Sequence, residues 1–329
     1  MVKNKKKVLV TGGAGYIGSI TSKILLENSF DVTIIDNLSA GRISAVPKGA
    51  KFIKGDISDK NLLEKTFNKN KYDCVIHFAC FIRIEESMIN PQKYFDNNIV
   101  AGLTLLQAMI ATKSCRKIIF SSSAAVYGVP KKIPLTEDAI MEPINPYGQT
   151  KMLFEIILKE YARAGLIDYV ALRYFNVAGA YISKDGDWGE SHEPESHIIP
   201  LILRSVNTNK VFSIFGDDYE TPDGTCVRDY IHVRDLAQAH ILAMNKKFKG
   251  GLVYNVGTGQ GFSNKQVFET AKQVTGVNIP YKIGPRRAGD CPFLVASATK
   301  IQKELGFKPL RTDLHTIITD AWQYIKKTL

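Results

Sequence analysis

The feature that most constrains this chain is a glycine-rich stretch close to its N-terminus. Residues 12–18 read Gly-Gly-Ala-Gly-Tyr-Ile-Gly and directly follow a short apolar run at 7–11. The first glycine of such a stretch permits a tight turn, the second lets the backbone approach a phosphate, and the third lets helix and strand pack closely. A glycine triplet also fits an ordinary turn. Its place between an expected strand and an expected helix favours a pyrophosphate held at the helix N-terminus.

Strand-like and helix-like segments alternate through the first half of the sequence. The expected strands are short, continuous and rich in Val, Ile and Phe, as is typical of parallel strands buried on both faces. They span residues 7–11, 31–36, 51–55, 72–78, 117–121 and 169–174. Helices are expected at 15–28, 59–68, 91–112 and 146–165. This alternation predicts an α/β fold with a Rossmann-type, doubly wound parallel sheet.

The local amino-acid composition changes after about residue 177. Gly, Asp, Pro and Ser are dense at 179–194 and 216–224, which predicts long loops, and such loops commonly carry binding residues. Further helices are expected at 198–207, 233–244, 264–275 and 313–327. We therefore expect a cofactor domain over residues 1–177, to which a segment near 231–256 returns. A smaller, interleaved mixed α/β substrate lobe is expected over residues 178–329.

The charge balance bears on the class of partner. Lys and Arg total 43 against 32 Asp and Glu, a formal charge of +11. That excess fits nucleic acid, a membrane surface or acidic small ligands. It consists mostly of Lys, whereas base and phosphate recognition favours the planar fork of Arg, and its densest cluster lies at residues 3–7. We expect small anionic ligands and no nucleic-acid partner.

The sequence also indicates a compartment. It has no run of about 18 apolar residues, and the apolar run at 8–10 is too short for the core of a signal peptide. The five cysteines are widely spaced and form no C-x-x-C pair. Reduced thiols are the simplest interpretation of that pattern. We expect a cytoplasmic protein without a membrane partner.

Carboxylates follow the second and third expected strands. Asp36 lies 18 residues after Gly18, where an acid accepts hydrogen bonds from a ribose 2′-hydroxyl and repels a 2′-phosphate. Asn37 comes next and no basic residue precedes Arg42, so NAD is favoured over NADP. A structural turn cap is the alternative role for Asp36. For Asp56, contact with an adenine ring and capping of the next helix both stay open.

A Tyr-x-x-x-Lys pattern marks the candidate chemistry. Tyr147 and Lys151 are four residues apart at the start of an expected helix, with Asn145 as its N-cap, and therefore share one helix face. Tyrosine titrates near about 10 and needs a neighbouring positive charge to act as a base at neutral pH. Ser123 closes the fifth expected strand, at the sheet edge where ligands bind. A surface Tyr–Lys pair is the alternative, but the glycine turn and the serine favour a reaction site.

These residues together make the chain similar to the extended short-chain dehydrogenases/reductases, and among them to the UDP-sugar 4-epimerases. The resemblance covers nearly all 329 residues, and its later motifs are the more specific ones. The motifs are Val10–Gly18, His77–Ala79, Ser121–Gly128, Asn145–Gly148, Arg173–Asn176, Gly216–Tyr219 and Gly224–Val233.

The resemblance implies an activity and a set of site residues. UDP-glucose and UDP-galactose would be interconverted through a transient 4-keto sugar, with hydride taken and returned by tightly bound NAD. Tyr147, aided by Ser123, would exchange the proton of the 4-hydroxyl, and Lys151 would hold the cofactor ribose. The implied cofactor contacts are Gly12, Gly15, Tyr16, Ile17, Gly18, Asp36, Asn37, Asp56, Ile57, Phe78, Ala79, Asn97, Ser121, Tyr147, Lys151 and Phe175. The implied substrate contacts are Ser123, Tyr147, Asn176, His197, Phe215, Arg228, Tyr230, Arg287 and Asp290. A homodimer through the helices near 91–112 and 147–165 is implied as well.

Some alternatives stay open. Another UDP-sugar, such as UDP-N-acetylglucosamine, UDP-glucuronate or UDP-xylose, fits because Ala125 and the loop 80–85 depart from the family pattern, and Leu294 does not decide the question. A catalytically silent NAD-binding sensor is disfavoured by the presence of all three catalytic candidates. A 4,6-dehydratase needs an extra acid and base beside the serine, where this chain has Ala124 and Ala125.

A histidine pair superficially resembles a zinc motif. His192 and His197 are five residues apart with Pro194 between them, whereas a helical zinc motif places its histidines four apart. We therefore expect no metal, and we expect His197 to lie near the nucleotide.

Overall fold

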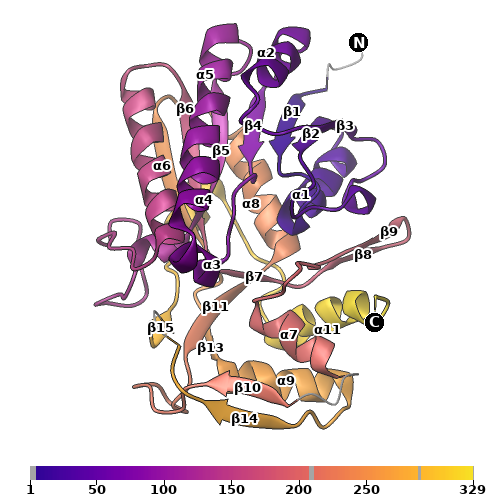
Figure 1. Ribbon diagram of the computed structural model, residues 1–329, viewed down its shortest axis with the longest axis vertical. Coiled ribbons are helices and arrows are strands. Elements are labelled where there is room, and N and C mark those ends of the chain that lie inside the picture. Colours follow the sequence, from indigo (N-terminus) through magenta and orange to yellow (C-terminus); the bar gives the residue numbers. More distant parts are fainter. Residues whose placement is uncertain (1–4, 207–210, 288–289, 329) are drawn as a thin grey trace. The chain divides into compact units, whose positions relative to one another are not determined.

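The computed structural model describes residues 5–206, 211–287 and 290–328, and the chain divides into two compact units (Figure 1). Unit 1 comprises the chain up to residue 128 together with 141–173 and 237–254. Unit 2 comprises 129–140, 174–236 and the chain from 255 onward. Each unit is thus assembled from stretches that are far apart in the sequence.

Unit 1 is built on a seven-stranded sheet with the order β12-β6-β5-β4-β1-β2-β3. Its strands are β1 (Lys7–Thr11), β2 (Asp31–Asp36), β3 (Lys51–Lys54), β4 (Cys74–His77), β5 (Lys117–Ser123), β6 (Asp168–Tyr174) and β12 (Gly251–Val256). The strands on both sides of β1 pair with it in parallel, and the chain changes direction across the sheet between β1 and β4. The predicted doubly wound sheet is confirmed, and ligands of such sheets bind at the carboxyl ends next to this switch point.

Helices cover both faces of the sheet in unit 1. Figure 1 shows α2, α5 and α6 on one face and α1 and α8 on the other. The helices of this unit are α1 (Tyr16–Glu27), α2 (Lys60–Lys69), α3 (Ile84–Ile89), α4 (Pro91–Phe95), α5 (Gly102–Thr112), α6 (Pro146–Arg163) and most of α8 (Val233–Asn245). Leu63 of α2, Leu105 of α5 and Phe154 of α6 are fully buried in one core with strand residues. Each such side chain contributes about 1.5–3 kcal/mol by burial.

The expected helix at 91–112 is interrupted. Between α4 and α5 the backbone widens into a π-helical segment, η2 (Asp96–Ala101). Apolar periodicity does not reveal such a turn, and π-helical segments are frequent at functional sites. Here it carries Asn97 and Asn98, which both contact the loop that follows β4.

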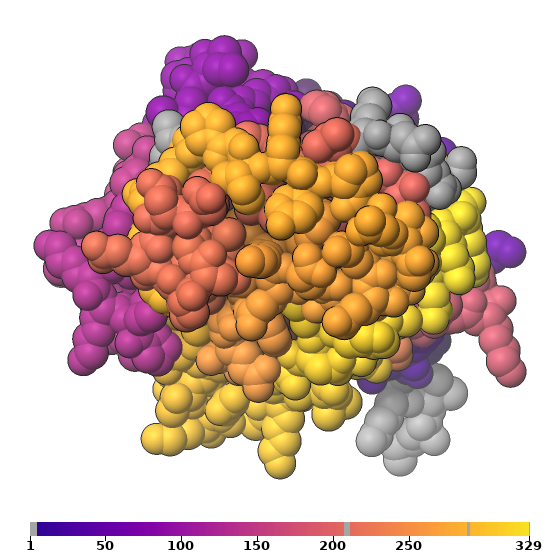
Figure 2. Space-filling view, turned by 90° about the horizontal axis from the view of Figure 1, so that it is seen from below, coloured from indigo at the N-terminus to yellow at the C-terminus, as the bar shows by residue number. Residues whose placement is uncertain are grey.

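Unit 2 contains a small mixed sheet centred on β11 (Val227–His232). β7 (Asn176–Ala178) and β15 (Phe293–Leu294) pair with β11 in parallel, and β13 (Gly261–Ser263) pairs with it antiparallel. A separate parallel pair joins β10 (Phe212–Phe215) to β14 (Tyr281–Gly284). The sheet residue Tyr230 shares a buried core with helices α7 (Ile198–Ser205), α9 (Asn264–Thr275) and α11 (Leu314–Ile325). The face seen in Figure 2 is formed mainly by the orange and yellow segments of this unit, and α10 (Thr299–Leu305) completes its helices.

The expectation of a loop over 179–194 is partly wrong. β8 (Tyr181–Ser183) and β9 (Gly186–Trp188) form an antiparallel hairpin there, in which the rings of Tyr181 and Trp188 lie 5.8 Å apart. Strands of three residues are too short to show an alternating pattern in the sequence. The segment at 216–224 has no helix or strand, as expected. Among the described residues, no helix is long and apolar enough to cross a bilayer.

Candidate active site

The glycine-rich turn connects β1 to α1 at the switch point of the sheet. Gly12 has φ +73°, and a Cβ on it would lie 2.6 Å from the backbone nitrogen of Ala79, so only glycine fits. Gly18 is equally confined, because its Cβ would lie 2.2 Å from the Gly12 carbonyl oxygen. Gly15 differs: its Cβ would meet only that oxygen, at 3.4 Å, and φ is −81°. Protein packing does not demand glycine at 15, whereas a diphosphate approaching the first turn of α1, where Tyr16 is already largely buried, would.

Asp36 closes β2 beside this turn. Its carboxylate accepts hydrogen bonds from the backbone N–H groups of Ala14, at 2.9 Å, and Leu38, at 2.8 Å. Asp36 therefore fastens the glycine turn to the end of β2, which is the structural role considered from the sequence. A carboxylate has about four lone-pair positions, so these two bonds leave acceptor capacity for a ribose hydroxyl.

Asp56 and Asn37 form a second polar group at the neighbouring strand end. The Asn37 amide donates to Asp56 at 2.7 Å, and the backbone N–H of Ser58 donates to the other Asp56 oxygen at 2.8 Å. Burial raises the pKa of Asp56, but the hydrogen bonds from Ser58 and Asn37 outweigh it and lower that pKa below its usual value. Ile57 packs in the apolar core of unit 1. The carboxyl ends of β2 and β3 thus present the carboxylates of Asp36 and Asp56 as hydrogen-bond acceptors side by side.

The loop after β4 is held by the π-helical segment. The buried Asn98 side chain accepts from the backbone N–H of Phe81 at 2.8 Å, donates to its carbonyl oxygen at 3.1 Å, and donates to Thr150 of α6 at 3.0 Å. Asn97 donates to the carbonyl oxygen of Ala79 at 3.4 Å. Asn98 was not predicted from the sequence. The available signal was the polar run Asp96-Asn97-Asn98 directly before an apolar stretch of the expected helix.

Lys151 lies at the centre of the catalytic candidates and is 2% exposed. Its Nζ donates to the carbonyl oxygen of Ser121 at 2.7 Å and lies 3.4 Å from the Ser121 hydroxyl. The same Nζ is 5.8 Å from the ring centroid of Tyr147. A buried ammonium needs such acceptors, and both are neutral. The structure thus brings three of the predicted residues together, with a positive charge one helical turn from the phenol.

The start of α6 lies against the segment that follows Ser123. Asn145 accepts the N–H of Gly148 at 2.8 Å and Pro146 is the first helical residue, which confirms the predicted cap. A Cβ on Gly148 would lie 2.5 Å from the carbonyl oxygen of Ala125. The Ser123 hydroxyl accepts the N–H of Ala125 at 3.2 Å. Tyr147 and Ser123 therefore come from two segments in direct contact.

A buried ion pair that was not predicted from the sequence lies next to this site. Arg173 donates to both carboxylate oxygens of Glu155, at 3.0 and 2.7 Å, and both side chains are almost fully buried. Arg173 also donates to the Tyr127 hydroxyl at 2.8 Å, and the Ser122 hydroxyl donates to Glu155. Glu155 lies one turn beyond Lys151 on α6. The pair ties α6 to the strand end that carries the serines.

Unit 2 gathers the predicted nucleotide contacts on and around β11. Asn176 is the register partner of Tyr230, whose buried hydroxyl makes no hydrogen bond within the described structure. Two residues before Tyr230 on β11, Arg228 donates to the carbonyl oxygen of Cys291 at 2.8 Å and lies 3.5 Å from the Asp290 carboxylate. Phe175, predicted as a cofactor contact, is buried and donates its N–H to the carbonyl oxygen of residue 256.

A second arginine lies beside an aromatic ring. The guanidinium of Arg287 is 4.1 Å from the ring centroid of Phe215, at the end of β10. The N–H of Asp290 donates to the Arg287 carbonyl oxygen at 3.3 Å, which links this arginine to the group around Arg228. Two guanidinium groups suit the bidentate binding of a diphosphate. An aromatic ring beside them suits a planar base.

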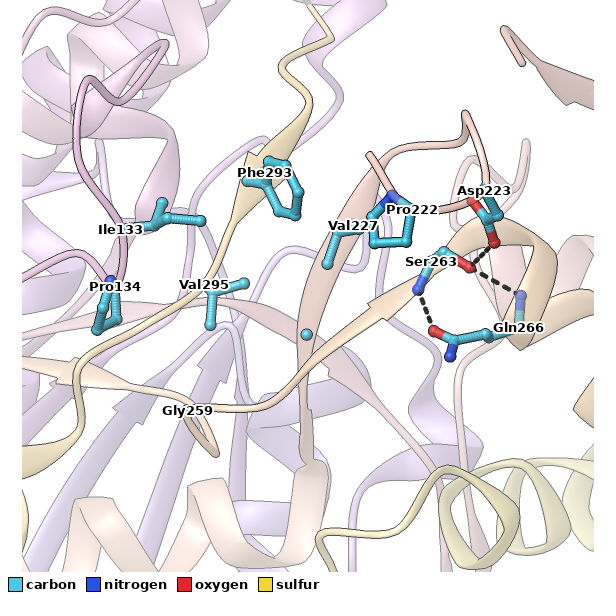
Figure 3. Close-up of a pocket in the computed structure, with 11 residues that line it drawn as sticks. Ile133, Pro134, Pro222, Asp223, Val227, Gly259, Ser263, Gln266, Phe293 and Val295 are labelled. Carbon is cyan, nitrogen blue, oxygen red and sulfur yellow. Dashed lines mark hydrogen bonds between the residues drawn. The ribbon is translucent and has the colours of Figure 1, made fainter. Parts of the chain in front are cut away.

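His197, the remaining predicted substrate contact, lies at the N-terminus of α7 with Glu190, His192 and Glu195 around it. Its Nδ1 lies close to the carboxylates of Glu190 and Glu195. A cavity of 530 Å³ elsewhere in unit 2 contains none of the predicted residues (Figure 3). The Ser263 hydroxyl donates to Asp223, and the side chains of Ser263 and Gln266 each accept the other's backbone N–H at the start of α9. The chemistry of the site therefore does not lie there.

Comparison with known proteins points to one family. Residues 8–257 match the group described as the NAD dependent epimerase/dehydratase family. The chain is 50% identical over 323 residues to a UDP-glucose 4-epimerase of Lactobacillus helveticus, with 97% of each chain covered. It is similar to a crystal structure of UDP-glucose 4-epimerase from Brucella ovis in complex with NAD, with TM-score 0.92, 44% identity and coverage of 97% and 98%. It is likewise similar to the Bifidobacterium longum enzyme in complex with NAD⁺ and UDP, with TM-score 0.92, 39% identity and 98% of each chain covered.

Proposed function

The chain belongs to the NAD-dependent epimerase/dehydratase family, and from this premise we propose that it interconverts UDP-glucose and UDP-galactose by inverting sugar C4, with NAD as its cofactor. One observation carries the proposal: a buried Lys151 bonded to Ser121, one helical turn from Tyr147. The chain aligns over nearly its full length with relatives that are 4-epimerases, and this supports the reaction class.

We propose that NAD binds at the carboxyl edge of the sheet in unit 1. Gly12, Gly15 and Gly18, with the backbone of Tyr16 and Ile17, would receive the pyrophosphate. The ribose and adenine would meet the acids at the ends of β2 and β3. The nicotinamide half would meet the loop after β4, the π-helical segment and the start of α6. The remaining cofactor residues of this proposal are Asp36, Asn37, Asp56, Ile57, Phe78, Ala79, Asn97, Ser121, Tyr147, Lys151 and Phe175. Bound NAD supplies a reversible acceptor for the hydride of sugar C4.

The proton chemistry belongs to three side chains of unit 1. Tyr147 takes the proton of the sugar 4-hydroxyl as hydride leaves C4, and the 4-keto sugar results. Ser123 hydrogen-bonds the same sugar oxygen, and Lys151 stabilises the phenolate. Return of hydride to the opposite face of C4, with the proton given back by Tyr147, inverts the centre. General acid–base help of this kind contributes about 10²–10⁴ in rate.

We propose that unit 2 holds the UDP portion. Arg228 and Arg287 bind the phosphates, because a guanidinium fork matches phosphate oxygens. Phe215 lies beside the uracil and Asp290 accepts from the ribose. Asn176 of β7 and Tyr230 of β11, which lie on paired strands, complete the proposed contacts to UDP. These anionic ligands account for the two arginines without any nucleic-acid partner, whereas the lysine excess stays on the surface.

The test is turnover by the purified holoenzyme without added NAD. UDP-galactose, UDP-N-acetylgalactosamine, UDP-glucuronate and UDP-xylose are supplied separately, and the products are separated by chromatography. We expect UDP-galactose to give UDP-glucose, with Tyr147→Phe as the matched inactive control. Turnover of only another sugar would transfer the assignment to that substrate. Failure with all four, despite bound NAD, would refute the epimerase and leave a silent NAD-binding sensor.

We further propose that two copies pair through the helices at 91–112 and 147–165. Apolar side chains are exposed on α3, η2 and α6, and α6 contacts both of the other two segments. They are Met88 (60% exposed), Ile89 (86%), Val100 (56%), Leu153 (37%) and Ile156 (43%). Exposed apolar patches of this kind mark interaction surfaces.

We also propose a cytoplasmic location, because all five cysteines are free thiols.

A further inference from the structure

Four potential metal ligands converge in the loop that leads from β9 into α7. They are Glu190, His192, Glu195 and His197, and each offers one ligand atom, all within 4.8 Å of one another. The spacing of His192 and His197 excludes a zinc motif only on a helix. In the structure these residues lie in an irregular loop, where side chains converge without helical spacing.

The separations suit a single small ion. His192 Nδ1 lies 3.1 Å from Glu190 Oε1, and His197 Nδ1 lies 2.6 Å from the same oxygen and 3.3 Å from Glu195 Oε1. Two ligands bound at about 2.1 Å in a tetrahedral site lie about 3.4 Å apart. These three separations are about 0.1–0.8 Å shorter than that value, and all four ligand atoms lie within 4.8 Å of one another. Movements of well under 2 Å would therefore complete four-coordinate geometry.

One buried oxygen of the cluster lacks a hydrogen bond among the described residues. Glu195 Oε2 is inaccessible and accepts none, whereas Glu195 Oε1 accepts the backbone N–H groups of Ser196 and His197. The carboxyl side chain of Glu195 is only 2% exposed, and that of Glu190 6%. Leaving a buried polar atom unpaired costs about 1–3 kcal/mol. A bound cation would satisfy Glu195 Oε2.

The charges around the cluster also favour a cation. The buried carboxylates of Glu190 and Glu195 both face the imidazole of His197, at 2.6 and 3.3 Å. Arg204 is a nearby positive group, 3.7 Å from Glu195, and it pairs at 2.9 Å with Glu193, outside the cluster. The two buried carboxylates therefore attract a cation.

We propose that Glu190, His192, Glu195 and His197 bind one divalent transition-metal ion, with Zn²⁺ as the best match. Two imidazoles and two carboxylates are typical zinc ligands, whereas Ca²⁺ and Mg²⁺ prefer oxygen alone. His197 is then a ligand of the metal, and Arg228 and Arg287 bind the phosphates of the substrate. The ion would fasten the loop to the first turn of α7.

The test uses the full-length holoenzyme, stripped with a chelator and reloaded with Zn²⁺ or Mg²⁺. Metal content per chain, Zn²⁺ affinity by calorimetry and the shift in Tm on loading are measured for the parent and for His192→Gln. His315→Gln is the matched control, because that imidazole is exposed on α11. We expect stoichiometric Zn²⁺ in the parent and control, with affinity at least about 10-fold weaker in His192→Gln. Glu195→Gln replaces it if His192→Gln does not fold.

Two results would overturn the proposal. Equal Zn²⁺ binding by the parent and by both cluster variants would mean adventitious binding elsewhere. Absence of stoichiometric Zn²⁺, with a Tm that does not respond to the metal, would mean that the cluster takes only a proton. The readouts are independent of epimerase turnover, so failure of the proposed function leaves this test intact.

Discussion

Acid sensitivity of folding is expected from one buried histidine at the sheet edge. His77 ends β4, is completely buried, and its Nδ1 lies 2.8 Å from the Thr11 hydroxyl. Burial, assisted by the charge of Lys151, lowers the pKa of His77 from 6.5 to about 3. The folded protein therefore keeps this imidazole neutral at pH values where the unfolded chain protonates it.

The sign and size of the effect follow from linkage. Because the pKa is depressed in the folded state, the stability is fully present above about pH 6.5 and is lost as the pH falls toward 3. Each pH unit in that window costs about 1.36 kcal/mol. From pH 6.5 to 5 the loss from His77 alone is about 2 kcal/mol, a large fraction of the usual stability of a protein.

Urea unfolding of the parent and of His77→Gln at pH 5, 6, 7 and 8 measures this loss. Glutamine keeps a hydrogen-bonding group for Thr11 but does not titrate, so the variant's free energy of unfolding should fall less between pH 7 and 5, by about 2 kcal/mol. The exposed His315→Gln change on α11 should leave the parental slope intact. Equal pH slopes in the parent and His77→Gln would refute a neutral buried imidazole.

Tyr147→Phe should lower UDP-galactose turnover by about 10² or more while NAD content stays stoichiometric; parental turnover would exclude Tyr147 as the base. Glu155→Gln leaves Arg173 buried without its counter-charge and should cost about 3–5 kcal/mol in urea unfolding; an unchanged free energy would contradict the buried pair. Val100→Glu should give monomers in light scattering after gel filtration, whereas Leu310→Glu, at a more exposed position of unit 2 (79% against 56%), should not; dimers in both would remove the proposed interface.

Signals that are local in the sequence predicted most of unit 1. Gly12 is required by its own φ and by the backbone of the adjacent strand end, so the turn is readable from a few residues. The cap of α6 by Asn145 is equally local. Strands buried on both faces appear as continuous apolar runs, which is why β1 and β2 have the predicted bounds.

The rest depends on pairings between distant residues. Asn98 bonds to Thr150, 52 residues away, and nothing near either residue indicates the other. The hairpin of β8 and β9 consists of strands too short for a periodic signal. The cluster around Glu190 is close in sequence, but the rule applied to it holds only for helices. Loop geometry, rather than spacing, brings its four side chains together.

The buried pair of Glu155 and Arg173 contributes to the site by position more than by energy. A buried ion pair adds little net stability, because desolvation offsets the attraction, and well-packed apolar residues often stabilise as well. Here the pair fixes α6 one turn beyond Lys151 and also bonds Ser122, next to Ser123. Both segments that carry the proposed proton chemistry are thereby held to one charge network. If that is its role, Glu155→Gln loses turnover in the fraction of protein that remains folded, which a purely structural pair would not cause.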